Sequence, residues 1–349
     1  MKNSLFYTFI FFILLIIGFF VSQRNFEIGA DTDSYKYYHS VFIDSEGVNT
    51  LALEPGFYLL FKLSILFSDS FRFFLFIEFF IFNLLYFFFY LKITYSLKYK
   101  ISIVQTLFLF GFTLLSSWYL LYSLNGLRQG LATPIVYLSF LFFIERRYLY
   151  SSILIFIATS IHSTSILLFP FFFFFRFNFK LIIYLFYTLA FLYFTYFNKF
   201  LILLFCKFTG LSPLYNFIID YGGPDAPDRG PVLRFLIYTL GLPSILIFIS
   251  NKLLIIKEQN NLKFVLKFYF ILCFPYFMLS YGGYSGRLAL YAWFLIPYIY
   301  SFLITKSKIN KYELRILSFL IFLLGTTSYL LLLNSDKLPL IFQGIWGKV

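Results

Sequence analysis

The sequence predicts an all-α, polytopic membrane protein, because the chain is rich in apolar residues and arranges them in long runs. It has 349 residues, of which 61% are hydrophobic, and it contains 56 Phe and 30 Tyr. Its mean hydropathy is +0.84. Charged residues make up 12% of the chain, whereas soluble domains carry roughly a quarter. A soluble protein of this length could not bury so much apolar surface.

The basic residues give a formal net charge of +13 and a pI of about 9.4. They lie in short clusters between apolar runs, which is the pattern of cytoplasmic loops in membrane proteins. We therefore expect no nucleic-acid partner and place the clusters in the cytoplasm. They are Lys92/Lys98/Lys100, Arg146/Arg147, Arg176/Lys180, Lys252/Lys257/Lys263 and Lys306/Lys308/Lys311/Arg315.

The first apolar run covers residues 5–21 and has some features of a signal peptide. No small-x-small cleavage site follows it, since the next residues are Ser22, Gln23 and Arg24. We expect a first span with its amino end in the cytoplasm. The polar segment that follows is acidic, and an acidic loop suits the outer side.

A short apolar run at residues 57–67 decides the topology. As a helix it would be roughly 18 Å long, too short for a hydrocarbon core of about 30 Å. If it crossed, every later basic cluster would face outward. If it is a re-entrant or interfacial helix, all the clusters fall inside, and we predict this second arrangement.

The remaining runs bring the total to about eleven transmembrane helices in one membrane domain, 1–349. The two spans beside His162 are short and are expected to be tilted or broken. External segments are predicted at 22–56 and 207–232, and the carboxyl tail from Asn334 is also external. The later spans are expected at 73–90, 101–121, 131–144, 151–161, 164–175, 181–205, 233–250, 264–281, 288–304 and 316–333.

A polar stretch at residues 122–132 is a candidate anion site. Arg128 and Gln129 stand there between two apolar runs, with Gly126 and Gly130 beside them. An arginine at the end of a span is costly unless it snorkels, pairs or faces water, and glycine lets another group approach the backbone closely. The stretch suits the capture of an anionic group, but an arginine that snorkels to lipid phosphates would look the same.

The predicted topology brings further polar residues to this outer face. Arginines suit a diphosphate, which their planar forks can grip bidentately. Tyrosine rings suit the apolar faces of sugars. Besides Arg128 and Gln129, the expected external residues are Asp31, Asp33, Tyr35, Glu54, His162, Arg229, Tyr281 and Arg287.

Four motifs follow one another along the chain: Asp31-Thr32-Asp33-Ser34-Tyr35, Glu54-Pro55-Gly56-Phe57, Leu127-Arg128-Gln129-Gly130-Leu131-Ala132 and Ile161-His162-Ser163. In this order they resemble the EpsG family of polysaccharide polymerases, which are relatives of the O-antigen polymerases called Wzy. The resemblance covers about residues 31–289.

This resemblance implies an enzyme of the bacterial inner membrane, a glycosyltransferase of the multi-span, lipid-donor (GT-C) type. It would transfer a growing glycan from undecaprenyl diphosphate onto a lipid-linked repeat unit at the outer, periplasmic face. The implied partners are undecaprenyl-diphosphate-linked oligosaccharides, membrane lipid, a chain-length regulator and a flippase. The resemblance implies no nucleotide sugar, metal or other cofactor.

The implied reaction assigns provisional roles to the polar residues. Arg128, and second Arg287, would grip the diphosphate, while Gln129, Arg229, Asp31, Tyr35 and Tyr281 would contact the substrate. His162 titrates in the range that suits a general base. Glu54 and Asp33 are rival bases that could instead pair with the arginines.

Other interpretations stay open from sequence alone. A flippase or transporter of lipid-linked oligosaccharide, or a scaffold of a polysaccharide assembly complex, would also be apolar and helical. Glu78 and Asn83 lie inside a span, where a glutamate is a functional candidate or part of a buried ion pair. Cys206 and Cys273 lack metal-type spacing and are expected to be packing residues.

Overall fold

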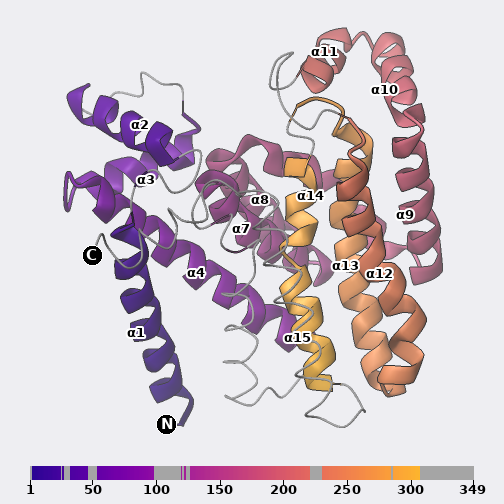
Figure 1. Ribbon diagram of the computed structural model, residues 1–349, viewed down its shortest axis with the longest axis horizontal. Helices are drawn as coiled ribbons and strands as arrows, with labels where there is room; N and C mark the ends of the chain where they lie inside the picture. Colours follow the sequence, from indigo (N-terminus) through magenta and orange to yellow (C-terminus); the bar gives the residue numbers. More distant parts are fainter. Residues whose placement is uncertain are drawn as a thin grey trace. The chain divides into compact units, whose positions relative to one another are not determined.

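Helices are the only regular secondary structure in the part of the chain that the computed structural model describes, which confirms the all-α class. The chain divides into two compact units at residues 166/167 (Figure 1). The single membrane domain expected from the sequence stays a prediction. The described residues are 2–24, 26, 32–45, 53–97, 119, 122, 126–220, 230–283 and 286–306.

Within these residues, three helices are long and apolar enough to cross a membrane: α4 (Phe71–Ser96), α7 (Leu127–Ile144) and α13 (Ile256–Leu279). A bent pair, α9 (Phe179–Phe194) and α10 (Phe197–Phe208), would make a fourth span if counted together. A helical membrane protein is therefore supported. The total of about eleven spans stays a prediction, because the expected span 316–333 and nearly all of 101–121 lie outside the described residues.

In the first unit, α1 (Lys2–Ser22) packs along α4 in the opposite direction. Ile10 of α1 lies in a cluster with Phe87 of α4. Gln23, just after α1, accepts a hydrogen bond from Arg72 Nη1 at the start of α4 (2.8 Å). The amino-terminal end of α1 therefore lies at the same end of the unit as the last turns of α4.

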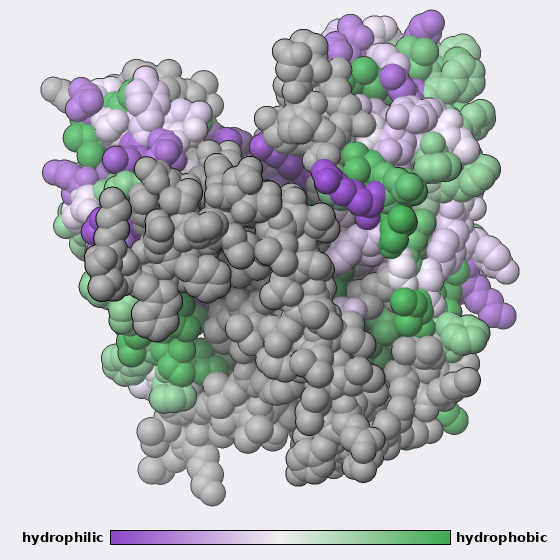
Figure 2. All heavy atoms as spheres, in the orientation of Figure 1, coloured by the Kyte–Doolittle hydropathy of each residue, from purple (hydrophilic) through white to green (hydrophobic). Residues whose placement is uncertain are grey.

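The outer face of α1 is strongly apolar. Its side chains Phe9, Phe12, Phe19 and Phe20 are exposed, and hydrophobic surface covers this part of the unit in Figure 2. Exposed phenylalanines along one helix suit contact with lipid rather than water.

α7 and α8 (Tyr148–Ile161) form a tight antiparallel hairpin. Arg146 in the turn has a left-handed backbone (φ 62°), and Ser139 Oγ of α7 donates to the Ser151 carbonyl of α8 (2.8 Å). Because the two helices run in opposite directions, the start of α7 and the end of α8 lie at the same end of the hairpin.

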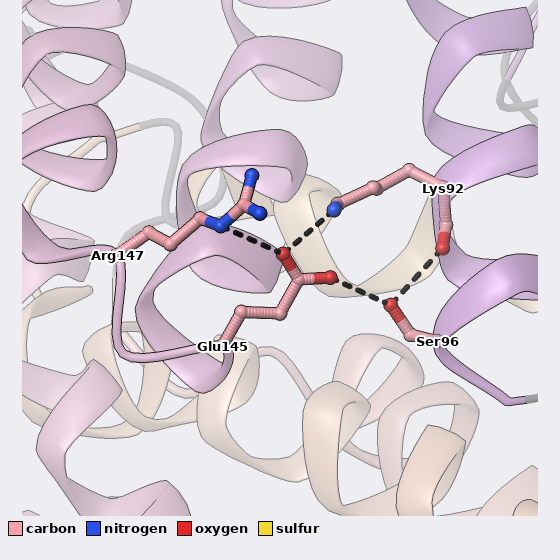
Figure 3. A network of polar contacts seen from close by, with 4 residues as sticks. All are labelled: Lys92, Ser96, Glu145 and Arg147. Atoms are coloured by element: carbon pink, nitrogen blue, oxygen red, sulfur yellow. Dashed lines mark hydrogen bonds and ion pairs between the residues drawn. The ribbon is translucent and has the colours of Figure 1, made fainter.

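A polar network joins the last turns of α4 and α7 (Figure 3). The Glu145 carboxylate accepts from Lys92 Nζ at 2.6 Å and from Ser96 Oγ at 3.3 Å, and Arg147 Nε lies 4.0 Å from it. Arg128 stands 17 residues before Glu145 on the same helix, which corresponds to about 26 Å. The network around Glu145 and the Arg128 side chain are thus separated by nearly the thickness of a hydrocarbon core, about 30 Å.

α3 (Pro55–Ile65) is the short run that was predicted not to cross. It has 11 residues and is about 16 Å long, too short to span. Its first turn packs tightly on the end of α8: a Cβ added to Gly56 would lie 2.4 Å from Ser160 Oγ and 2.9 Å from the Ser160 carbonyl oxygen. Only glycine permits so close an approach.

α2 (Thr32–Asp44) lies within the acidic segment and is held by aromatic rings. The buried His39 ring lies 5.6 Å from the Phe61 ring and 6.0 Å from the Phe74 ring, measured between centroids. Burial lowers the pKa of His39, and the nearby Asp69 carboxylate partly offsets this effect. The buried His39 ring thus packs α2 onto α3 and α4.

In the second unit, α13 lies at the centre and packs against α9, α12 and α14. Cys206 and Cys273 are both buried and free, which confirms their prediction as packing residues. Besides α9, α10 and α13, the described helices that follow α8 in the chain are η1 (Ser163–Arg176, a 3-10 helix), α11 (Ser212–Asp220), α12 (Leu233–Leu253), α14 (Gly286–Trp293) and α15 (Ile296–Lys306).

Two expected spans of this unit are not continuous. The run predicted at 181–205 is divided into α9 and α10, which bend by 89° where Tyr196 adopts the left-handed conformation (φ 60°). A left-handed residue ends a helix. The run predicted at 288–304 is divided into α14 and α15, because Pro297 lacks the amide hydrogen that would continue the helix and its ring would clash with the preceding turn.

The packing of the first unit predicts that the two ends of α7 face opposite sides of the membrane. Arg146→Cys and Asp33→Cys place single thiols at exposed positions, in a chain whose two native cysteines are replaced by alanine. We expect a membrane-impermeant maleimide to label one position in intact cells and the other only after permeabilisation. Labelling of both from the same face would contradict this arrangement.

Replacing Glu145 by Gln should destabilise the first unit, because it leaves the Lys92 ammonium, 20% exposed, without its carboxylate. We expect a loss of about 1 kcal/mol or more, measured as a thermal unfolding temperature lowered by a few degrees in detergent. Arg147→Gln is the matched control, since Arg147 is 60% exposed and 4.0 Å from Glu145. Equal effects of the two substitutions would argue against the network.

The substitution Gly56→Ala should destabilise the unit by about 1–3 kcal/mol, because the new methyl group overlaps the Ser160 backbone. Gly126→Ala is the control: among the described residues its Cβ would meet the Tyr122 ring, at an ordinary 3.5 Å. Thermal unfolding of the two variants compares them. A harmless Gly56→Ala would show that α3 does not pack on α8 as described.

Candidate functional site

The site is centred on Glu54, the residue immediately before α3. Pro55 occupies the first position of this helix, where a missing amide hydrogen costs nothing, so the sequence begins a helix there. The Glu54 carbonyl accepts from the amides of Phe57 (3.0 Å) and Tyr58 (2.9 Å). Its side chain makes no capping hydrogen bond to its own helix, and the carboxylate is left to contact other elements.

Arg128 is the principal partner of Glu54. Its Nη1 lies 2.5 Å from Glu54 Oε2, with side chains 29% and 19% exposed, respectively. Arg128 stands in the first turn of α7, where the helix dipole disfavours a cation. An anion beside it is therefore needed, and Glu54 supplies one. The helix begins before the span predicted at 131–144, so Arg128 and Gln129 are helical rather than part of a loop.

Tyr35 of α2 holds the other edge of the arginine. Arg128 Nε donates to the Tyr35 hydroxyl at 3.2 Å, and the guanidinium carbon lies 5.8 Å from the centre of the Tyr35 ring. Tyr35 is buried and packs against Phe57 of α3, with centroids 5.5 Å apart. Two donors of the guanidinium are thus fixed by groups from two different elements.

His162 completes the cluster from the end of α8. Its backbone is extended, and its amide still donates to the Ala158 carbonyl (2.8 Å). Its Nδ1 lies 3.9 Å from Glu54 Oε1, and its side chain is 9% exposed. This distance exceeds a hydrogen bond but is short enough for an ion pair when the imidazole is protonated. One carboxylate oxygen therefore faces Arg128 and the other faces His162.

Close backbone packing positions α7 at this end. A Cβ on Gly130 would lie 2.9 Å from the Tyr122 carbonyl oxygen, so the predicted close approach at Gly130 is present. Gly126 has no such contact. The contact between Gly56 and Ser160, which was not anticipated, plays the same part for Glu54 and His162. In the sequence this contact is marked only by a small residue near each partner, Gly56 near Glu54 and Ser160 near His162. Such a pattern is too common to predict a contact.

Of the other predicted residues in the first unit, Gln129 is buried beside Arg128. Asp33 is exposed on α2 and makes no hydrogen bond or ion pair with any other described residue. Asp31 and Arg229 lie outside the described residues.

Arg287 and Tyr281 belong to the second unit, so their relation to Arg128 stays a prediction. Arg287 is partly exposed in the first turn of α14. Tyr281 is buried among other tyrosines, with ring centroids 5.1 Å from Tyr193 and 6.1 Å from Tyr196.

The intramembrane residues of α4 form a separate polar group. Neither Glu78 oxygen has a hydrogen-bond partner among the residues that the structure describes, and the buried Arg24 interacts with the carboxylate electrostatically. Asn83 Oδ1 accepts from the Tyr119 hydroxyl (2.5 Å). The described residues contain no group of three or more His, Cys, Asp or Glu that could hold a metal ion.

Comparison with known protein families identifies a family for this chain. The sequence profile of the EpsG family matches residues 6–342, nearly the whole chain. No curated protein and no solved structure matches it. The chain therefore belongs to the EpsG family, whose members are Wzy-like polymerases.

Proposed function

We propose that this protein polymerises a bacterial surface polysaccharide. It transfers a growing glycan from undecaprenyl diphosphate onto a lipid-linked repeat unit, as a glycosyltransferase of the inner membrane acting at the outer face. The observation that carries the proposal is the convergence of Arg128, Glu54 and His162 from three elements, α7, the start of α3 and the end of α8.

The placement of charges supports an outward-facing site. Lys92 and Arg147 lie at the opposite end of α7 from Arg128, and basic residues favour the cytoplasmic side. This rule favours a position of Arg128 at the outer membrane surface. A lipid-linked diphosphate would lie at that depth, and the Arg128 side chain is 29% exposed there, so an anion could reach it.

The residues suit the bonds that must change. The acceptor hydroxyl forms a new bond to the anomeric carbon of the donor sugar as the bond from that carbon to the diphosphate breaks. Arg128 stabilises the charge that develops on the diphosphate. His162 takes the acceptor proton, and the Glu54 carboxylate beside Nδ1 stabilises the resulting imidazolium.

The substitution Arg128→Lys tests the assignment. Lysine keeps the charge but loses the planar fork, so we expect a loss on the order of 100-fold in polymerisation. An arginine that only snorkels to lipid would tolerate the change. The readout is the ladder of surface polysaccharide on a gel, from a deletion strain that expresses each variant at matched protein level.

The control is Arg147→Lys at the other end of the hairpin, which should give a normal ladder. A full-length ladder from Arg128→Lys would remove Arg128 as the diphosphate clamp. The deletion strain tests the function itself: single-repeat products indicate a missing polymerase, whereas complete loss of surface product indicates a missing flippase.

A further inference from the structure

We propose that Glu54 is a displaceable counter-ion: the donor diphosphate replaces it on Arg128, and the released carboxylate then pairs with His162. This inference rests on the proposed function and adds an order to its steps. The acid–base pair is completed only after the leaving group has been bound.

The first ground is how Arg128 is occupied. Nε is held by Tyr35 and Nη1 by Glu54, while Nη2 makes no hydrogen bond to any described residue. Because Tyr35 occupies Nε, a bidentate grip on a diphosphate has to use the two terminal nitrogens of the fork. Glu54 occupies one of them, so the carboxylate and the diphosphate compete for the same donor. Tyr35 holds the guanidinium from its Nε side and does not obstruct the exchange.

The second ground is that Arg128 is accessible and strongly favours an anion. The side chain is 29% exposed although its partners are largely buried. The start of α7 adds the positive end of a helix dipole, which favours a phosphate group as well as a carboxylate. A diphosphate carries more negative charge than Glu54, so this environment stabilises it more strongly.

The third ground is the position of Glu54 after displacement. A buried carboxylate that loses its cation is costly unless another partner is at hand. Glu54 Oε1 already lies 3.9 Å from His162 Nδ1, and a shift of about 1 Å would bring it within hydrogen-bond distance. The exchange therefore moves the Glu54 carboxylate from the Arg128 guanidinium to His162, which becomes a cation when it takes the acceptor proton.

Charges balance through the cycle. Before donor binding, Arg128 is paired with Glu54 and His162 stands beside the pair. After binding, Arg128 is paired with the diphosphate, and the proton from the acceptor hydroxyl converts His162 to an imidazolium facing Glu54. When the diphosphate carrier leaves and His162 releases the proton to water, Glu54 returns to Arg128.

Binding of inorganic pyrophosphate to the purified protein, measured by isothermal titration calorimetry, tests the competition. Removing the charge with Glu54→Gln should tighten binding about tenfold or more, because a site that is mostly occupied by its internal anion loses affinity in proportion. The same variant should lose on the order of 100-fold in polymerisation. Binding and activity thus change in opposite directions, which a merely structural residue would not produce.

Two further variants make the result specific. Glu54→Asp keeps the charge with a shorter reach to Arg128 and should tighten binding by a smaller factor; it also serves if Glu54→Gln does not fold. Asp69→Asn removes one exposed carboxylate near the start of α4 and should leave the affinity as in the wild type, which separates local competition from a general charge effect.

Unchanged or weaker pyrophosphate binding by Glu54→Gln and Glu54→Asp would overturn the proposal and make Glu54 a fixed support of Arg128. The proposed function fails differently, through a full polysaccharide ladder from Arg128→Lys. The two outcomes can therefore be told apart.

Discussion

The ion pair between Glu54 and Arg128 is the constraint on which this end of the first unit depends. It places a cation in the first turn of an apolar helix, where the helix dipole opposes it, and balances it with a carboxylate from the start of another helix. Tyr35 and His162 contact the two partners of this pair. Because both side chains are partly buried, removing either charge would leave the other without its closest counter-ion. The pair thus joins α2, α3, α7 and α8 at one point.

Much of the fold follows from run length and charge. α4 and α13 were predicted because long apolar runs leave few alternatives to a spanning helix, and α3 was predicted to be short because its run is short. The breaks at Tyr196 and before Pro297 were not predicted. A left-handed tyrosine has no sequence signature, since any residue type can take that conformation when packing demands it. A proline inside an apolar run either kinks or ends a helix, and hydropathy does not distinguish these outcomes.

The site was predictable to the extent that residue type reveals function. Arg128, His162 and Glu54 stood out because charges near spans are costly and must be used. Which residue of α2 meets Arg128 depends on the rotational phase of that helix, and the structure selects Tyr35 over Asp33. The contact of Gly56 with Ser160 could not be inferred, because it depends on how closely the start of α3 approaches the end of α8. Arg287 was grouped with these residues because the predicted topology put it on the same side of the membrane. In the structure it belongs to the second unit.

The most direct test of the central claim is a structure of the protein in lipid with an undecaprenyl-diphosphate-linked oligosaccharide bound. The account predicts diphosphate oxygens within hydrogen-bond distance of both terminal nitrogens of Arg128, with Tyr35 still on Nε and the Glu54 carboxylate moved onto His162. A donor whose diphosphate lies elsewhere, with the Glu54–Arg128 pair intact, would contradict it.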